Sequence, residues 1–224
     1  AKFAMPEAAI GFVSDVGVNC ILAKAPVHRA LLFLMSGTAV GAADALALGL
    51  TDGAVARERV GELRSGIVAA ARADNIAAAI VALMQMHTIQ AGDRVLCALA
   101  DRLAEALAAD SAGEIVAAIK ARSGESHDIA EMAQLLASRS PTSLEAIVQS
   151  HCAARLMPGP AEVLALDLRL ARLLAGMPDF TEGVRAVLVD KDQRPVWAPA
   201  DFAAVPEAAI RAAVAGTASV GAAV

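Results

Sequence analysis

Aromatic side chains are scarce in this chain of 224 residues, which has five Phe, one Trp and no Tyr. Alanine instead occupies 56 positions, and it is the strongest helix former because ordering it loses no side-chain entropy. A β-sandwich or barrel would need more aromatic and β-branched residues, and a disordered chain would have far fewer than 57% hydrophobic residues. The composition therefore predicts a mainly α-helical protein with a buried core.

Clusters of basic residues and long apolar runs are also lacking. The 24 acidic residues outnumber the 19 basic ones, whereas a nucleic-acid surface would need Lys and Arg gathered against phosphates. The uncharged stretch Ala30–Ala43 is interrupted by two glycines, and a membrane span needs about 20 apolar residues. The chain does not open with the pattern of a signal peptide. We therefore expect a cytoplasmic protein with no nucleic-acid partner and no membrane contact.

Residues typical of disulfides and metal sites are few and scattered. The three cysteines are odd in number and lie far apart: Cys20, Cys97 and Cys152. They fit neither a disulfide framework nor a zinc spacing, so we expect three small buried side chains in a reducing compartment. The four histidines lack metal-ligand spacing and are expected at surfaces or helix ends: His28, His87, His127 and His151. The sequence thus predicts no metal site.

The first quarter of the chain combines a strand signal with a glycine-spaced loop and apolar helices. Lys2–Met5 has the character of the end of a strand, which the following proline stops. After the loop we expect an apolar helix over residues 18–34, closed by Gly37. A shorter helix over residues 42–48 is expected to end at Gly49.

The rest of the chain has the periodicity of helices. From residue 57 to residue 139 we expect helices without strands, with Asp74 and Ser111 as N-caps. Four leucines of this region share one helical face: Leu96, Leu99, Leu103 and Leu107. Ser140 followed by Pro141 is typical of a helix start, because proline is tolerated in the first helical position. A leucine stripe then predicts a further helix over residues 161–175.

A pair of carboxylates near the start is the best candidate for chemistry. Glu7 follows the predicted strand end, and Asp15 lies in the loop before an apolar helix. A carboxylate in apolar surroundings has a raised pKa and can act as a general acid or base near neutral pH. Two of them on one loop can polarise a single water molecule. The alternative is structural, with Glu7 capping one helix and Asp15 capping the next.

The segment around Glu7 resembles the crotonase (enoyl-CoA hydratase/isomerase) superfamily. In Phe3–Phe12, which reads FAMPEAAIGF, a Pro-Glu pair follows a strand and leads into a loop, as it does in that superfamily. Leu34–Gly37 is similar to the family's helix end. Ala42–Leu50 is similar to its short helix that closes with a glycine followed by Leu or Ile.

Within the superfamily, the chain is most similar to the 3-hydroxyisobutyryl-CoA hydrolase branch of valine breakdown. Asp15-Val16-Gly17 resembles that branch's acidic loop, and the long connection between Val55 and Ser140 is absent from simple hydratases. Two C-terminal stretches are close to the branch's signatures: Ser140–Leu144 and Phe180–Asp192, the latter with Trp197 nearby.

The resemblance implies that the chain is the C-terminal part of a ββα-spiral α/β fold with an extended helical region. Residues 1–55 would end the core and carry the acidic loop, residues 56–139 would be a helical insertion, and residues 140–224 a C-terminal helical region. Glu7 would be the catalytic and substrate-binding glutamate, and Asp15 the second acidic residue with both roles. CoA would enter as part of the acyl-CoA substrate, so no separate cofactor is implied.

The resemblance also implies a partner, because the oxyanion-binding half of such a site has no counterpart here. We expect a homo-oligomer or a missing N-terminal half. The chain departs from the branch at Ser14, where proline is usual, and at Val18 and Asn19, which replace glycines. Two alternatives stay open, namely an enoyl-CoA hydratase or isomerase, and a non-catalytic helical fragment that serves oligomer contacts.

Overall fold

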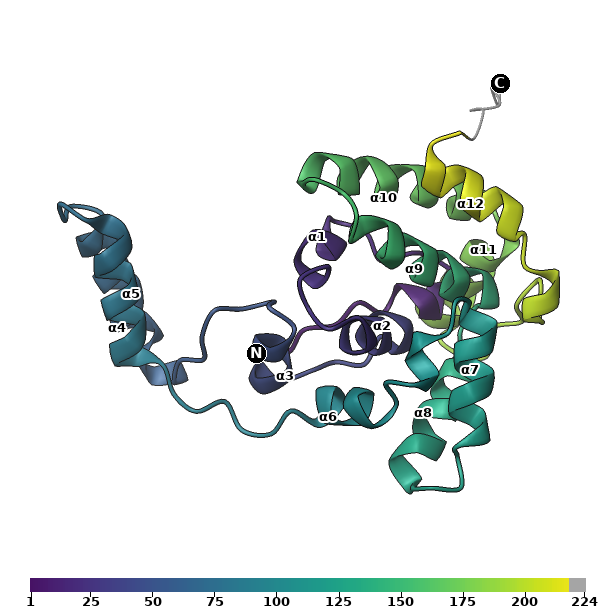
Figure 1. Cartoon of the computed structure of the whole chain (residues 1–224), viewed down its shortest axis with the longest axis horizontal. Coiled ribbons are helices and arrows are strands. Elements are labelled where there is room, and N and C mark those ends of the chain that lie inside the picture. Colours follow the sequence, from purple (N-terminus) through teal and green to yellow (C-terminus); the bar gives the residue numbers. More distant parts are fainter. Residues whose placement is uncertain (218–224) are drawn as a thin grey trace.

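The computed structural model describes residues 1–217 and is built almost entirely of helices (Figure 1), which confirms the predicted mainly α class. The α-helices are α1 (Val18–Leu22), α2 (Val27–Ser36), α3 (Ala42–Ala47), α4 (Val60–Ala70), α5 (Ile76–His87), α6 (Val95–Arg102), α7 (Ala112–Ala121), α8 (His127–Ala137), α9 (Pro141–Ala154), α10 (Pro160–Ala175), α11 (Pro178–Val184) and α12 (Glu207–Ala215). Shorter 3-10 or π turns are η1 (Glu7–Ile10), η2 (Arg57–Arg59), η3 (Ala106–Ala108), η4 (Arg185–Val189) and η5 (Phe202–Ala204). The end of the predicted C-terminal region, residues 218–224, lies outside the described residues.

Within residues 1–217, β pairing is limited to two isolated bridges. Phe3 pairs with Val40: the Phe3 N–H donates to the Val40 carbonyl at 3.0 Å, and the Val40 N–H donates back at 2.8 Å. Val55 pairs with Thr88 in the second bridge. The predicted strand end at Lys2–Met5 is therefore an extended segment with a single bridged residue, held beside the chain that leaves α2.

The single helix expected over residues 18–34 is wrong, because the structure divides it into α1 and α2. The break falls at Ala23–Pro26, and Pro26 is the N-cap of α2. Proline has no N–H to donate to a preceding turn, and it disfavours helical geometry in the residue before it. The predicted closure at Gly37 is confirmed, since this residue has a left-handed φ of 67°.

Helix α2 is the centre of the hydrophobic core. Every residue from Ala30 to Ser36 is buried, and α6, α8 and α9 pack around it. A helix that is apolar all round needs such complete coverage. The four leucines predicted to share a face are all buried in the same core: Leu96, Leu99, Leu103 and Leu107.

Among residues 1–217, three helices are capped by the side chain of the residue directly before them, and two of these caps are where the sequence predicts. Ser111 accepts the N–H of the residue three positions on, and so does Ser140, which is followed by Pro141. For α5 the prediction of Asp74 is wrong, since the cap is Asn75, whose side chain accepts the Ala78 N–H at 3.0 Å. Asp74 lies one residue too early for its carboxylate to take this role.

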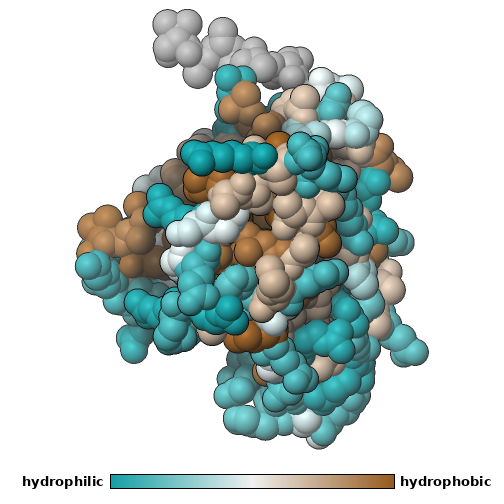
Figure 2. All heavy atoms as spheres, turned by 90° about the vertical axis from the view of Figure 1, so that its left-hand side faces the viewer, coloured by the Kyte–Doolittle hydropathy of each residue, from teal (hydrophilic) through white to brown (hydrophobic). Residues whose placement is uncertain are grey.

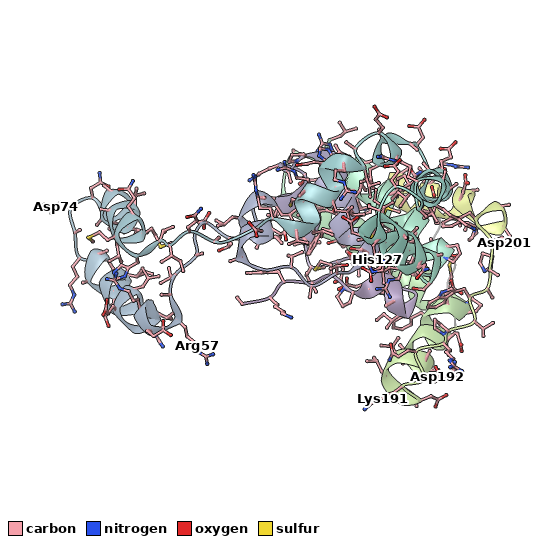
Figure 3. The ribbon with its side chains drawn as sticks, turned by 90° about the horizontal axis from the view of Figure 1, so that it is seen from below. Arg57, Asp74, His127, Lys191, Asp192 and Asp201 are labelled. Atoms are coloured by element: carbon pink, nitrogen blue, oxygen red, sulfur yellow. The ribbon has the colours of Figure 1, made fainter. Side chains whose placement is uncertain are left out.

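Helices α4 and α5 form a hairpin that stands away from the rest of the molecule (Figures 1 and 3). Gly66 of α4 packs closely on Leu83 of α5, and the hairpin joins the body next to the Val55–Thr88 bridge. Figure 2 views the molecule from the side on which the hairpin stands, and it shows apolar side chains exposed there among polar ones. Large apolar side chains exposed on the hairpin include Val60, Val68, Ile76, Val81 and Met86. The expected homo-oligomer stays a prediction.

The region 56–139 thus has two parts with different surroundings. The hairpin is mostly exposed, whereas α6, α7 and α8 pack against α2, α9 and each other. The boundaries predicted at 55 and 139 stay predictions.

The cysteines differ from one another in burial, so the expectation of three buried side chains is wrong. Only Cys97 is buried, while Cys20 is half-buried and Cys152 is exposed. Burial, with a hydrogen bond to Asp44, raises the pKa of Cys97 to about 12, so this thiol stays protonated at neutral pH. His151 lies in the last turn of α9, as expected for a helix-end histidine, but it is fully buried and not at the surface.

Two glycines let η1 lie directly against α11. Gly11 ends η1 with a left-handed φ of 70°, and a side chain there would overlap the backbone of Asp179. Gly183 lies within α11, and a side chain there would overlap the backbone of Ile10. The start of the chain, including Glu7, is therefore packed against a helix more than 150 positions later in the sequence.

We expect Gly183→Ala to destabilise the fold by about 1–3 kcal/mol or more, because the added methyl group forces the two backbones apart. The measurement is urea unfolding followed by circular dichroism. Gly124→Ala is the control, since nothing lies within 4 Å of a side chain at that position, and its stability should change by less than about 1 kcal/mol. Equal midpoints for the two variants would contradict the close packing of η1 on α11.

Candidate functional site

Glu7 opens the 3-10 turn η1 directly after Pro6 and is half-buried. Its Oε2 atom accepts a hydrogen bond from the hydroxyl of Ser14 at 3.3 Å. Ser14 is itself buried, so this hydroxyl is directed at the carboxylate by the packing around it. Ser14 stands where the resembled family usually has proline, and it gives Glu7 a donor that proline lacks.

The pKa of Glu7 is raised, mainly because burial disfavours the charged carboxylate. The negative charge of Asp15 raises it further, while hydrogen bonds from the Glu7 backbone and from Ser14 act in the opposite direction. Asp15 thus lies close enough for its charge to act on the Glu7 carboxylate, and the role of the two residues as a site stays a prediction. A carboxylate with a raised pKa and a nearby second carboxylate suits proton transfer at near-neutral pH.

The structural alternative, in which the two carboxylates cap helices, is not what the molecule shows. Pro6 precedes η1 and Gly17 precedes α1, and neither element has a side-chain cap. Asp15 instead uses its backbone carbonyl, which accepts the Val18 N–H at 3.2 Å. Both carboxylates are thus left for other interactions.

The turn that carries Asp15 has an unusual backbone. Val16 has φ of 57° and Gly17 has φ of 73°, so two consecutive residues are left-handed. For a β-branched residue this conformation is a genuine outlier, which costs on the order of 1–3 kcal/mol and persists only when its surroundings enforce it. The N–H of Gly17 donates to Oδ2 of Asp167, on α10, at 2.8 Å.

A buried polar network anchors α1, directly after this turn. The side-chain amide of Asn19 donates to the Ser150 hydroxyl at 3.2 Å, and its oxygen lies 3.0 Å from Nδ1 of His151. Burial and the positive charge of Arg155 lower the pKa of His151 to about 4, so its ring is neutral at physiological pH. Asn19, a departure from the resembled glycines, is thus a structural link between α1 and α9.

Sequence reasoning missed Ser14, Asp167 and the Asn19–His151 pair. Asp167 had a signal that can be read in the sequence, since it is a single acidic residue on the buried face of a leucine-rich helix. A charge in that position is rarely buried without a partner. The partners of Asn19 lie about 130 positions away, and no pattern in the sequence indicates them.

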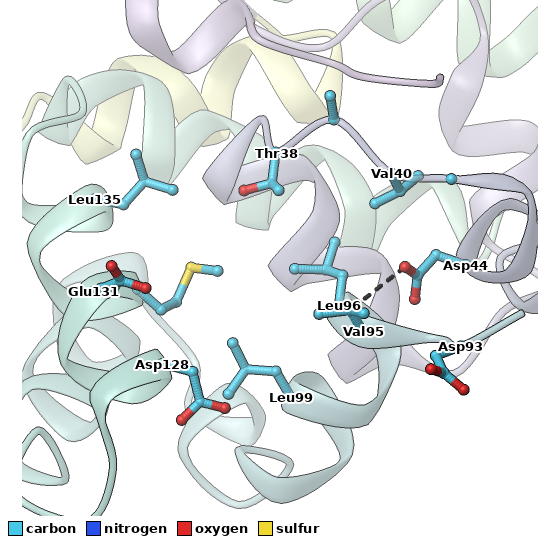
Figure 4. A pocket seen from close by; sticks show the side chains of 13 residues that line it. Thr38, Val40, Asp44, Asp93, Val95, Leu96, Leu99, Asp128, Glu131 and Leu135 are labelled. Atoms are coloured by element: carbon cyan, nitrogen blue, oxygen red, sulfur yellow. Dashed lines mark hydrogen bonds between the residues drawn. The ribbon is translucent and has the colours of Figure 1, made fainter. Parts of the chain in front are cut away.

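A groove lies elsewhere, between α6, α8 and the chain that follows α2 (Figure 4). It has a volume of about 520 Å³ and an apolar wall that includes Leu96, Leu99 and Met132. Its carboxylates are Asp44, Asp93, Asp128 and Glu131, which would repel the phosphates of a nucleotide. Asp44 has a structural role there, since its oxygens accept the N–H groups of Leu96 and Cys97 at the start of α6. Neither Glu7 nor Asp15 lines this groove.

Residues 1–217 contain neither a metal-binding cluster nor a helix that could span a membrane. Among these residues, no group of three or more His, Cys, Asp or Glu side chains is placed to hold a metal ion. In the same part of the chain, every helix is too short or too polar to cross a bilayer.

Solved structures resemble this fold over nearly all of the chain. A carnitinyl-CoA dehydratase from Mycobacterium thermoresistibile matches with a TM-score of 0.82 and 29% identity, covering 99% of this chain and 60% of that one. An enoyl-CoA hydratase from Rhodobacter sphaeroides matches with a TM-score of 0.77 and 30% identity, covering 98% and 60%. The helical architecture is thus that of a part of these larger enzymes.

Sequence comparison gives the family. The human mitochondrial 3-hydroxyisobutyryl-CoA hydrolase is 32% identical over 215 residues, which are 92% of this chain and 53% of the human protein. The Xenopus laevis mitochondrial hydrolase of the same name is 30% identical, with the same coverage. The chain thus spans about half the length of these curated relatives. Residues 1–214 match the family described as enoyl-CoA hydratase/isomerase, and the chain belongs to that family.

Proposed function

We propose that this chain carries the acid–base part of a site that hydrolyses an acyl-CoA thioester, with 3-hydroxyisobutyryl-CoA as the substrate. The observation that carries the proposal is the half-buried Glu7, with its raised pKa, beside Asp15 and the Ser14 hydroxyl. The relatives named 3-hydroxyisobutyryl-CoA hydrolase support this substrate over other acyl-CoA thioesters. CoA enters and leaves as part of the reaction, so no resident cofactor is invoked.

In this proposal Glu7 is the general base. It takes a proton from water as the water oxygen bonds to the thioester carbonyl carbon, and the carbon–sulfur bond then breaks. The proton passes to the departing sulfur, so the products are free CoA and 3-hydroxyisobutyrate. Direct attack by the Glu7 carboxylate on the same carbon, followed by hydrolysis of the anhydride, gives the same products. Asp15 orients the attacking water or the hydroxyl of the acyl group.

A second candidate is the addition of water to an enoyl-CoA, or the reverse reaction. The two solved structures are named as a dehydratase and a hydratase, and two carboxylates around one water also suit that chemistry. The two reactions differ in their products. Hydrolysis releases a thiol, whereas hydration removes the absorbance of the acyl double bond and releases no thiol.

We expect Glu7→Gln to lower the turnover of 3-hydroxyisobutyryl-CoA by about 100-fold or more, because the amide cannot accept the proton. Free CoA should be measured by chromatography, since the exposed Cys152 would react with thiol reagents. The assay compares the 224-residue chain with the same polypeptide extended upstream to the length of its relatives. Glu105→Gln, at an exposed carboxylate outside the site, is the matched control and should leave turnover unchanged. Near-normal turnover by Glu7→Gln would refute its role as base.

We expect Ser14→Ala to raise the pKa of Glu7 further, because the hydroxyl hydrogen bond stabilises the charged carboxylate. A base works only when deprotonated, so the acidic limb of the kcat/KM profile should move to higher pH. Turnover by Ser14→Ala should therefore be lower than that of the parent at pH values near the original pKa of Glu7, and should equal it at higher pH. A carbon-13 NMR titration of Glu7 checks the same shift without any turnover.

Ser123→Ala is the control for this experiment, because its hydroxyl bonds only to the Lys120 carbonyl. It should move neither the profile nor the titration. If Ser14→Ala leaves both unchanged, the hydrogen bond does not tune Glu7.

A further inference from the structure

The strained backbone of the Asp15 turn is held by hydrogen bonds and not by packing of the Val16 side chain. The Val16 side chain is 75% exposed, so packing of that side chain does not fix its left-handed conformation. Gly17 follows with a left-handed φ of its own, and α1 begins only after it. The turn is closed by the Asp15 carbonyl, which accepts the Val18 N–H at 3.2 Å, and on its inner side the Gly17 N–H points into the protein.

Asp167 adds a second hydrogen bond to the turn, from a rigid helix. Its carboxylate is only 4% exposed, and Oδ2 accepts the Gly17 N–H at 2.8 Å across 150 positions of sequence. Leu166, Leu170 and Leu174 on the same helix are fully buried, which fixes the position of α10. A hydrogen bond to a charged acceptor on such an element is strong and well oriented.

The surroundings of Asp167 disfavour a charged carboxylate, so an acidic residue at this position calls for a role. No Arg, Lys or His forms an ion pair with it among residues 1–217, and its Oδ1 atom is buried without a hydrogen-bond partner. Burial raises the pKa of this carboxyl, and the negative charge of Asp15 adds to the effect. The negative charges of Asp15 and Asp167, which are far apart in sequence, thus act on each other at this turn.

We propose that Asp167 is a positioning residue for the candidate site, holding the Asp15–Val16–Gly17 turn through the Gly17 N–H and so directing the Asp15 carboxylate toward Glu7. Its consequence for turnover rests on the proposed function. The side chain itself touches the turn and not the substrate. Loss of the Asp167 side chain leaves both Glu7 and Asp15 in the chain, but the turn that orients the Asp15 carboxylate is free to move.

The test compares Asp167→Ala and Asp167→Asn with Glu162→Gln, an acid-to-amide change on the exposed face of the same helix. Amide hydrogen exchange is measured at Gly17 by NMR on the full chain, with urea unfolding to confirm that each variant is folded. We expect exchange at Gly17 to rise about tenfold or more in Asp167→Ala. Asp167→Asn, which keeps a neutral acceptor oxygen, should show a smaller rise. Glu162→Gln should match the parent.

Turnover gives the second measurement, on the polypeptide that shows activity. A displaced Asp15 should lower kcat about 10- to 100-fold in Asp167→Ala, with KM little changed if positioning alone is lost. Unchanged exchange at Gly17 in a folded Asp167→Ala overturns the proposal whatever the activity. Faster exchange with an unchanged kcat also overturns it, provided that Glu7→Gln is inactive. If Glu7→Gln keeps full turnover, the proposed function has failed, and the exchange result shows separately whether the anchor exists.

Discussion

The fold depends on buried carboxylates that accept backbone N–H groups from segments far away in sequence. Asp44 holds the start of α6, Glu145 accepts the N–H of Ala112 at the start of α7, and Asp167 accepts that of Gly17 before α1. Asp179 accepts the Ala198 N–H and the Ser140 hydroxyl. A buried charge is tolerated only with such partners, and helix starts have N–H groups to offer. In a chain so rich in alanine, few large side chains are available to specify how the helices meet.

The candidate site is built from both ends of the chain. Glu7 and Ser14 belong to the first segment, whereas α11 packs on η1 through two glycines and α10 holds the turn that follows Asp15. The C-terminal helices thus support the acidic loop directly. The match to the enoyl-CoA hydratase/isomerase family likewise extends across residues 1–214 and is not confined to the loop. The α4–α5 hairpin contributes nothing to this support, since it packs mainly on itself.

Some sequence-based predictions failed at local signals such as Pro26, and others failed because packing between helices decides burial. The helix expected over residues 18–34 divides at Pro26, although apolar periodicity continues through the break. His151 and Cys152 are neighbours on α9, yet the first is fully buried and the second is exposed. Periodicity reports which side of a helix is apolar, but burial depends on which other helices cover it. Polar side chains such as Asn19 are buried because a partner exists, and the partner is visible only in the folded chain.

The sequence by itself determined the helical class, the glycine stops at Gly37 and Gly49, the caps at Ser111 and Ser140, and the position of Glu7 and Asp15 within one short segment. These features are local, since each follows from residues within one or two turns of the chain. Only the tertiary structure decided that Asp167 lies under that loop and that α11 supports Glu7. Contacts between residues 150 positions apart are set by how helices pack, and packing satisfies buried polar groups across the whole chain at once.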